Sequence, residues 1–383
     1  MDTLHTVAEE RVRHAARTNA SSLSLRNLEL SSLPESLGGL ADLVILDLSE
    51  NNLQTLPPFL KNLSGLRQLR LRSNRLQTLP EFVGSFEFLS ELDLSYNELT
   101  KLPDSIGSLT NLTQLNLTKN SLTELPESMR QLKQLTDLNV ARNELSSIPN
   151  ALESLTLLRS LILCYNRLST IPAFLGALPE LRRLDLTYAL RAELPNDLGQ
   201  FAELRELALG GNHLPSLPET IGGFAKLEEL DVPSNWLTAF PDFLCSLSQL
   251  RHLDISNNKL RHIPESLGSL KQLRYLNLQS NHLVALPASV GSLSQLEHLV
   301  VTRNELRSLP DSIGSLQQLR QLDLFANNLA GLPLAIGGLP RLDFLNLEGN
   351  PLSSELQIAY ENGLIAVQEH LRSEAKTRTH THS

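Results

Sequence analysis

The sequence predicts an α/β solenoid, in which short strands and short helical turns alternate along a stack of similar coils. The first observation is an asparagine that recurs at multiples of 23 residues from Asn51 to Asn350, interrupted only at Ala189. The second is a pair of leucines two residues apart, such as Leu46 and Leu48, which is the spacing of one face of a strand. An unbroken period of roughly 20 to 50 residues is typical of solenoids.

The segments between strands predict short helical turns. A proline stands six residues after each of the 14 positions at this spacing from Leu28 to Asn327. Proline fixes φ and has no N–H, so it suits an extended segment that has left the sheet. Ile106 and Leu109 then follow Pro103 at helical spacing. We expect one or two turns of helix there, packed against the strand leucines.

The two ends of the chain differ from the repeats. Apolar residues at helical spacing within residues 1–19 predict an amphipathic capping helix, because a solenoid exposes its core at each end. Residues 20–352 hold about 15 repeats of 23 residues. Residues 353–373 predict a C-terminal cap of two short helices, separated at Asn362 and Gly363. Residues 374–383 are polar without an apolar anchor, and we expect them to be disordered.

Charge and cysteine usage limit the partners and the compartment. The formal net charge of -9 argues against a nucleic acid partner, because binding to a phosphate backbone depends on a basic surface. Cys164 and Cys245 stand far apart in different repeats, which favours a reducing compartment. No apolar run is long enough to span a membrane, and the charged N-terminus lacks the apolar stretch of a signal peptide. We therefore expect a cytoplasmic protein.

The sequence contains no P-loop, HExxH, CxxC or GxSxG motif. Neither cysteine has the companions that a zinc site requires. The pair His380 and His382 is more typical of a solvated tail than of a metal site. We expect no enzyme activity, no cofactor and no metal.

The pattern LxxLxLxxNxLxxLPxxIGxL is present almost letter for letter in residues 89–111. It resembles the intracellular leucine-rich repeats of plant Ras-group proteins, Ras-suppressor-like proteins and the erbin and densin scaffolds. The sequences at both ends resemble those that flank the repeats of Roco proteins. The resemblance implies a right-handed horseshoe with a parallel sheet on its concave face, and an asparagine side chain that bonds the backbone of neighbouring coils. It also implies a protein partner held in the concavity, for which a small GTPase or its regulator is one candidate.

The outward residue between the two strand leucines is most often Asp or Asn, as at Asp47, Asp93 and Asn116. One interpretation is that these are the default residues of this repeat class. The other is an acidic groove that selects a basic partner surface and steers its association. The sequence leaves both interpretations open.

Departures from the repeat pattern indicate where a partner would bind. The first group, the central cluster, comprises Ile162, Cys164, Tyr165, Arg183 and Tyr188. Aromatic and arginine side chains are enriched in binding hot spots. The alternative is drift in one degenerate repeat, because Ala189 cannot form the asparagine bond and Arg191 occupies a leucine column. We expect Leu190 to turn inward there, since burial of an unpaired arginine is costly.

A second group of outward residues lies nearer the C-terminus. It comprises His252, Tyr275, His298, Val300 and Phe325. Exposed rings on adjacent coils indicate a contact surface. Phe344 either extends this surface or packs under the C-terminal cap, and Trp236 is either a rim contact or packs on its neighbours.

These observations predict a non-enzymatic scaffold that binds a partner protein on its concave face, in small-GTPase or related signalling. The alternative is a bacterial effector or regulator, injected into a host or kept in the cell, that binds and blocks a signalling enzyme. A purely structural module that self-associates is a third hypothesis. We expect a monomer.

Overall fold

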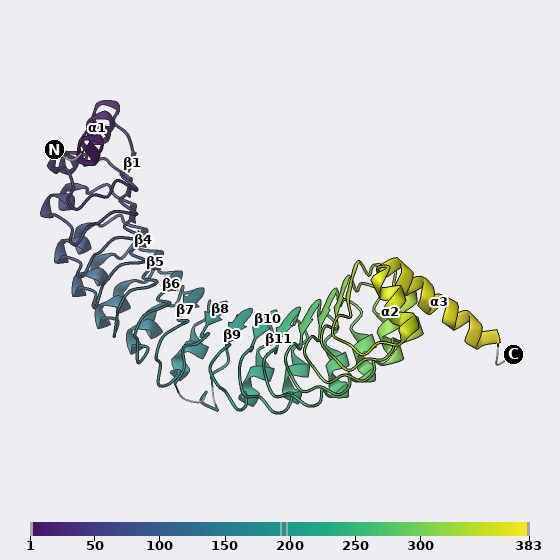
Figure 1. The fold of residues 1–383 in the computed structure, drawn as a ribbon. Coiled ribbons are helices and arrows are strands. Elements are labelled where there is room, and N and C mark those ends of the chain that lie inside the picture. Colours follow the sequence, from purple (N-terminus) through teal and green to yellow (C-terminus); the bar gives the residue numbers. More distant parts are fainter. Residues whose placement is uncertain (1–2, 192–193, 197, 381–383) are drawn as a thin grey trace. The chain divides into compact units, whose positions relative to one another are not determined.

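The computed structural model describes residues 3–191, 194–196 and 198–380 (Figure 1). They form two compact units, unit 1 up to Leu204 and unit 2 from Arg205. Within each unit, every three-residue strand lies beside the strands of the neighbouring coils and runs parallel to them. The strands line the inner side of each unit and the 3-10 turns lie on its outer side. The parallel solenoid expected from the sequence is therefore confirmed in each unit.

Unit 1 begins with helix α1 (Thr3–Thr18) and continues as a sheet in chain order. Its strands are β1 (Ser22–Ser24), β2 (Ile45–Asp47), β3 (Gln68–Arg70), β4 (Glu91–Asp93), β5 (Gln114–Asn116), β6 (Asp137–Asn139), β7 (Ser160–Ile162) and β8 (Arg183–Asp185). Its 3-10 turns are η1 (Glu35–Gly39), η2 (Pro58–Asn62), η3 (Glu81–Ser85), η4 (Asp104–Ser108), η5 (Glu127–Gln131), η6 (Asn150–Ser154) and η7 (Ala173–Ala177). Helix α1 buries Ala8, Val12 and Ala15, and Arg11 donates a hydrogen bond to the Ser24 carbonyl at 3.1 Å. The helix therefore packs on the first coil.

Unit 2 repeats this arrangement and ends in two helices. Its strands are β9 (Glu206–Ala208), β10 (Glu229–Asp231), β11 (His252–Asp254), β12 (Tyr275–Asn277), β13 (His298–Val300), β14 (Gln321–Asp323) and β15 (Phe344–Asn346). Its 3-10 turns are η8 (Glu219–Gly223), η9 (Asp242–Ser246), η10 (Glu265–Ser269), η11 (Ala288–Ser292), η12 (Asp311–Ser315) and η13 (Leu334–Gly338). The helices are α2 (Ser354–Glu361) and α3 (Leu364–His380).

Helix α3 continues through residues 374–380, where the polar sequence predicts a disordered tail. The structure describes residues 374–380 as helical, and residues 381–383, with His382, lie outside the described part of the chain. Arg372 Nε donates to the Gly337 carbonyl at 2.6 Å, which docks the middle of the helix on η13. His370 Nε2 lies 3.5 Å from Glu374 Oε1, one turn further along the same helix. Lys, Glu and Ala favour helices, so polarity alone does not predict disorder here.

The outer turns explain why glycine recurs after the first apolar residue of each turn. Pro103, at φ −71° and ψ 153°, leads into η4 in an extended conformation. A Cβ atom added to Gly107 would lie 2.4 Å from the Ser128 carbonyl oxygen on the next turn. Close stacking of adjacent turns, and not a positive φ, therefore favours glycine.

The asparagine column forms a hydrogen-bonded ladder along the coils of each unit, interrupted at Ala189 in unit 1. Asn97 Oδ1 accepts the Leu76 N–H at 3.0 Å, and Asn97 Nδ2 donates to the carbonyls of Leu71 and Leu94 at 3.0 Å each. The same contacts recur at Asn120 and at other asparagines of the column. The amide therefore satisfies backbone groups of its own coil and of the preceding coil in the interior, where an unpaired polar group is costly.

We expect Asn97→Ala to lower the free energy of unfolding by about 2–4 kcal/mol, because it leaves buried backbone groups without partners. Urea denaturation measures this loss, and faster hydrogen exchange of the Leu76 amide localises it. The matched control is Asn111→Ala, which removes one exposed hydrogen bond to the Glu87 carbonyl. An equal loss in both variants would contradict the importance of the ladder.

Candidate functional site

The Asp and Asn residues between the strand leucines support the turn at the end of each strand. Asp93 Oδ1 accepts the Ser95 N–H at 2.9 Å, and Asp254 Oδ1 accepts the Ser256 N–H at 2.9 Å. A short acceptor side chain that bonds the backbone two residues further on is a common turn device. This contact supports the structural interpretation of the column, and the acidic groove stays a prediction.

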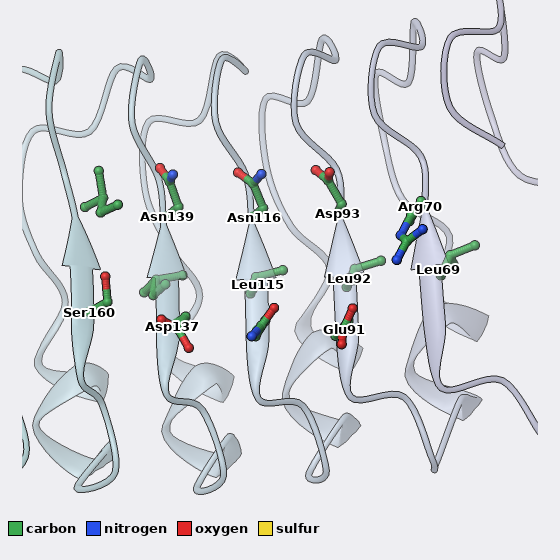
Figure 2. Close-up of a pocket in the computed structure, with 13 residues that line it drawn as sticks. Leu69, Arg70, Glu91, Leu92, Asp93, Leu115, Asn116, Asp137, Asn139 and Ser160 are labelled. Atoms are coloured by element: carbon green, nitrogen blue, oxygen red, sulfur yellow. The ribbon is translucent and has the colours of Figure 1, made fainter. Parts of the chain in front are cut away.

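The inner face of unit 1 carries a hollow of about 310 Å³ across β3 to β7 (Figure 2). Asp93, Asn116 and Asn139 stand in a row on three adjacent strands. The ionic side chains of its lining are Arg70, Glu91, Asp93 and Asp137, and Ile162 lies at its β7 end. This volume is at the lower limit of small-molecule sites, roughly 300 Å³. The hollow is therefore small for a site that encloses a ligand.

The residue before each asparagine adopts a left-handed backbone conformation. In unit 1, φ is 57° at Tyr96, 57° at Lys119, 54° at Arg142, 56° at Tyr165 and 51° at Tyr188. Such values are uncommon outside glycine, and the inter-coil hydrogen bonds maintain them here. The Tyr165 amide, for example, donates to the Thr187 carbonyl at 2.8 Å. The turn thus places one side chain per coil along the rim of the sheet.

The centre of the predicted central cluster is an exposed aromatic stack. The rings of Tyr165 and Tyr188 have centroids 5.1 Å apart and planes inclined by 21°. They remain 43% and 45% exposed. Arg142 Cζ lies 4.6 Å from the centroid of the Tyr165 ring, within the range of a cation–π contact. The structure therefore brings the two predicted tyrosines together and adds an arginine that the sequence analysis did not select.

The other members of the central cluster lie beside this stack. Ile162 and Cys164 are half-buried, and Arg183 is exposed. Burial, followed by the negative charge of Asp185, raises the pKa of the Cys164 thiol to about 11. Because a thiol with this pKa is protonated at neutral pH, Cys164 contributes a small apolar surface and not a nucleophile.

The degenerate repeat replaces the missing asparagine with a backbone contact. The Leu168 N–H, which corresponds to the amide bonded by an asparagine in other coils, donates to the Ala189 carbonyl at 2.8 Å. Ala189 is fully buried, Leu190 is half-buried, and Arg191 is exposed. The chain therefore keeps the arginine in solvent, as expected, while the coil stays bonded to its neighbour.

Three residues of the second cluster form a continuous row in unit 2. The rings of His252 and Tyr275 stack with centroids 4.2 Å apart and planes inclined by 6°, and the His298 centroid lies 6.3 Å from that of Tyr275. This histidine–tyrosine row is half-buried. Asp231 Oδ1 lies 3.2 Å from His252 Nε2, although without the alignment of a full hydrogen bond.

Burial and neighbouring carboxylates shift the pKa values of His252 and Tyr275. Burial is the largest influence on His252 and by itself would lower the pKa of that imidazole. The contact with Asp231 and its charge, together with Glu229 and Asp254, outweigh burial, so the pKa of His252 is raised. Burial and then the charges of Asp254 and Asp231 raise the pKa of Tyr275. The raised pKa of His252 therefore depends on the carboxylates around it.

Val300 and Phe325 lie on the same inner face but do not extend the ring stack. Val300 is half-buried and pairs in register with Asn277 and Asp323. Phe325 is half-buried, with Arg303 Cζ 6.0 Å from its ring centroid. Phe344, for which packing under the cap was one alternative, is 44% exposed.

The sequence analysis missed a longer feature of which the tyrosine pair is one end. We call five consecutive exposed positions of the left-handed column in unit 1 the rim strip, comprising Tyr96, Lys119, Arg142, Tyr165 and Tyr188. Arg72 Cζ lies 4.6 Å and Lys119 Nζ lies 4.9 Å from the Tyr96 centroid. The strip could have been found in the sequence by comparing the residues that stand directly before each position of the asparagine column.

Trp236 has an equivalent, smaller setting in unit 2. Its ring centroid lies 4.8 Å from that of His213, and Lys259 Nζ lies 5.3 Å from it. The tryptophan is nevertheless 50% exposed. It therefore packs on its neighbours and remains open to a partner at the same time.

The described residues contain no group of three or more His, Cys, Asp or Glu side chains placed to hold a metal ion. None of the helices in this part of the chain has the length and apolar character that a membrane span needs.

The comparisons with known proteins agree with this geometry. A profile described as leucine-rich repeat region matches residues 58–173 and 241–346, and a leucine-rich repeat profile matches residues 42–63. A leucine-rich repeat protein of Leptospira interrogans is 33% identical, with 91% of this chain and 96% of that chain covered and a TM-score of 0.86. No curated protein sequence matches the chain.

Two further structures are similar over much of the chain. A plant peptide hormone receptor in complex with RGF2 is 28% identical, with a TM-score of 0.64. That alignment covers 84% of this chain but only 57% of the receptor chain. An internalin from Listeria monocytogenes, 22% identical over 88% of this chain and 94% of that chain with a TM-score of 0.67, shares the fold alone.

We expect Asp231→Asn to lower the pKa of His252, because the substitution removes a negative charge while burial of the imidazole remains. In the unmodified protein, the raised pKa stabilises the fold below the pKa of the unfolded chain, and this contribution is lost as pH rises through the folded-state pKa. Titration of the His252 ring protons by NMR measures the change. The control is Asp323→Asn in the same column of unit 2, and an unchanged His252 titration in Asp231→Asn would refute the assignment.

Proposed function

The chain belongs to the leucine-rich repeat family, whose fold is a common scaffold for protein interaction, and from this premise we propose that it is a non-enzymatic scaffold for a partner protein. The partner binds the inner, concave face of the sheet and its rim, with the chain acting as a cytoplasmic monomer in a signalling setting. The free thiols of Cys164 and Cys245 support a reducing compartment.

The observation that carries the proposal is the stacked pair of Tyr165 and Tyr188. Two aromatic rings that are 43% and 45% exposed leave a large apolar area in water, which binding to a partner would bury. Inter-coil hydrogen bonds from the Tyr165 amide to the Thr187 carbonyl and from the Leu168 amide to the Ala189 carbonyl hold the backbone at Tyr165 and on both sides of Tyr188, so little backbone freedom is lost on binding. Rigid, exposed tyrosines beside an arginine have the composition of an interaction hot spot.

The similar plant receptor gives the proposal a precedent for a ligand on this fold, since that structure contains RGF2. Other features add area on the inner face. The histidine–tyrosine row and Phe325 provide further partly exposed rings in unit 2. We treat the tyrosine pair as the anchor, because it is the more exposed.

We expect the double change Tyr165→Ala with Tyr188→Ala to weaken binding of the partner by more than tenfold, since both rings act as one stacked surface. The partner is recovered from cells that express the full chain by affinity capture and mass spectrometry, and its affinity is then measured by titration. The urea denaturation midpoint should change little, because the rings are exposed.

The matched control is Leu157→Ala, which removes an apolar side chain that is 38% exposed outside the tyrosine pair. It should leave the affinity within about twofold of the unmodified protein. If the double alanine variant binds the partner as tightly as this control does, the tyrosine pair is not the anchor.

A further inference from the structure

We propose that the rim strip of unit 1 binds an extended acidic segment of the partner protein. The proposal rests on the proposed function and adds the chemistry of the partner at the same tyrosine pair. It is carried by three cations, Arg72, Lys119 and Arg142, which are exposed along a row of tyrosine rings.

These cations differ from other arginines of the solenoid in their surroundings. Elsewhere, arginines between coils are paired with carboxylates, such as Arg167 with Glu144 at 2.8 Å and Arg274 with Glu297 at 3.1 Å. Among the described residues, no carboxylate lies within ion-pair distance of Arg72, Lys119 or Arg142. Tyrosine rings occupy their near surroundings instead.

The cations are spread along the strip. Lys119 and Arg142 hold equivalent positions on adjacent coils, and the Lys119 amide bonds the Ala141 carbonyl, one residue before Arg142. Lys119 Nζ lies over the ring of Tyr96 and Arg142 Cζ lies over the ring of Tyr165, so the two charged groups lean toward opposite neighbouring coils. A carboxylate of the partner that reached either cation would form a charge-assisted hydrogen bond.

The acidic side chains nearest the strip already have hydrogen-bond or ion-pair partners. The nearest Asp column is engaged with the backbone, since Asp93 Oδ1 accepts the Ser95 amide and Asp185 Oδ1 accepts the Thr187 amide, each at 2.9 Å. Arg72 has only a longer-range attraction to Glu50, which is itself paired with Arg26. The strip therefore offers positive charge that the protein does not neutralise through contact.

The length of the strip defines the shape of the ligand. Tyr96 to Tyr188 spans four coil spacings, about 19 Å at 4.8 Å each. An extended peptide rises about 3.3 Å per residue, so about six residues cover this distance. Alternate side chains face the same side, and every second residue of the segment would meet the cations. An apolar or aromatic residue at one end would lie against the Tyr165 and Tyr188 rings.

A protein segment fits better than a nucleic acid. The chain has a formal net charge of -9, and the hollow beside the strip is lined by Glu91, Asp93 and Asp137. A phosphate backbone carries one negative charge per nucleotide and would meet these carboxylates along its length. A peptide can place a few acidic side chains on the cations and neutral ones elsewhere.

The test is fluorescence anisotropy with the full chain and labelled eight-residue peptides at low salt. The acidic probe alternates glutamate with serine between terminal tryptophans, and the neutral probe replaces each glutamate with glutamine. We expect the acidic probe to bind at least tenfold more tightly than the neutral one, with an advantage that shrinks as salt rises. Equal affinities would overturn the proposal, and so would tighter binding of an eight-nucleotide oligothymidylate.

The variant Lys119→Glu with Arg142→Glu should abolish the preference for the acidic probe. Its matched control is Arg130→Glu with Lys133→Glu, which makes the same change in net charge at and beside turn η5. Lys119→Gln with Arg142→Gln provides the same test should the reversal disturb folding. If the control loses the preference equally, net charge and not the strip is responsible, and the proposal fails.

The two proposals fail separately. Loss of partner binding in the double tyrosine variant, together with no preference for the acidic probe, would leave the scaffold function intact and remove only the acidic ligand. Retention of partner binding in the double tyrosine variant would instead remove the anchor, whatever the peptides show.

Discussion

The hydrogen bonds of the asparagine amide are the constraint on which the structure depends. Each amide occupies the interior of the turn, where Asn120 for example bonds Leu99 N–H and the carbonyls of Leu94 and Leu117. A turn this tight leaves backbone groups that no ladder partner can reach, and burial without partners would cost about 1–3 kcal/mol for each. Each amide also reaches a carbonyl of the preceding coil, as Asn120 reaches Leu94, and so ties adjacent coils together.

A constant turn has a direct effect on the surface. Because each coil repeats the same backbone angles, side chains at equivalent positions stand above one another at about the spacing of strands, roughly 4.8 Å. Aromatic and cationic residues at such positions are obliged to stack, as His252 does on Tyr275 and Arg142 does on Tyr165. Binding surfaces in this protein are therefore columns of equivalent residues, and a single substitution extends or interrupts a column.

The period in the sequence was sufficient to predict the coils, the buried leucines and the outer turns, because these follow from repeated local contacts. It also placed Tyr165 beside Tyr188, since the two stand one period apart. The repeat pattern does not show that the residue before each asparagine position has a positive φ or where its side chain points. Lys119 and Arg142 were therefore not assigned to the same surface as the tyrosines. Phe325 was grouped with Tyr275 from coil proximity alone, whereas the structure places it under Arg303. Helix α3 passes residue 374, and Arg372 in the middle of this helix bonds the Gly337 carbonyl, a tertiary contact that composition does not contain.

The net charge of this protein differs in sign from the local charge of the rim strip, because acidic and basic side chains occupy different columns of the repeat. The chain is acidic, yet the acidic groups of the column between the strand leucines are partly used as hydrogen-bond acceptors for the turn, as at Asp93 and Asp185. Lys119 and Arg142 lie three residues after the column between the strand leucines, at a position where the turn needs no side-chain hydrogen-bond acceptor. An acidic solenoid can thus present a basic, aromatic edge next to an acidic face. A partner that bridges both must carry opposite charges on adjoining surfaces, and such a pattern gives specificity that net charge cannot.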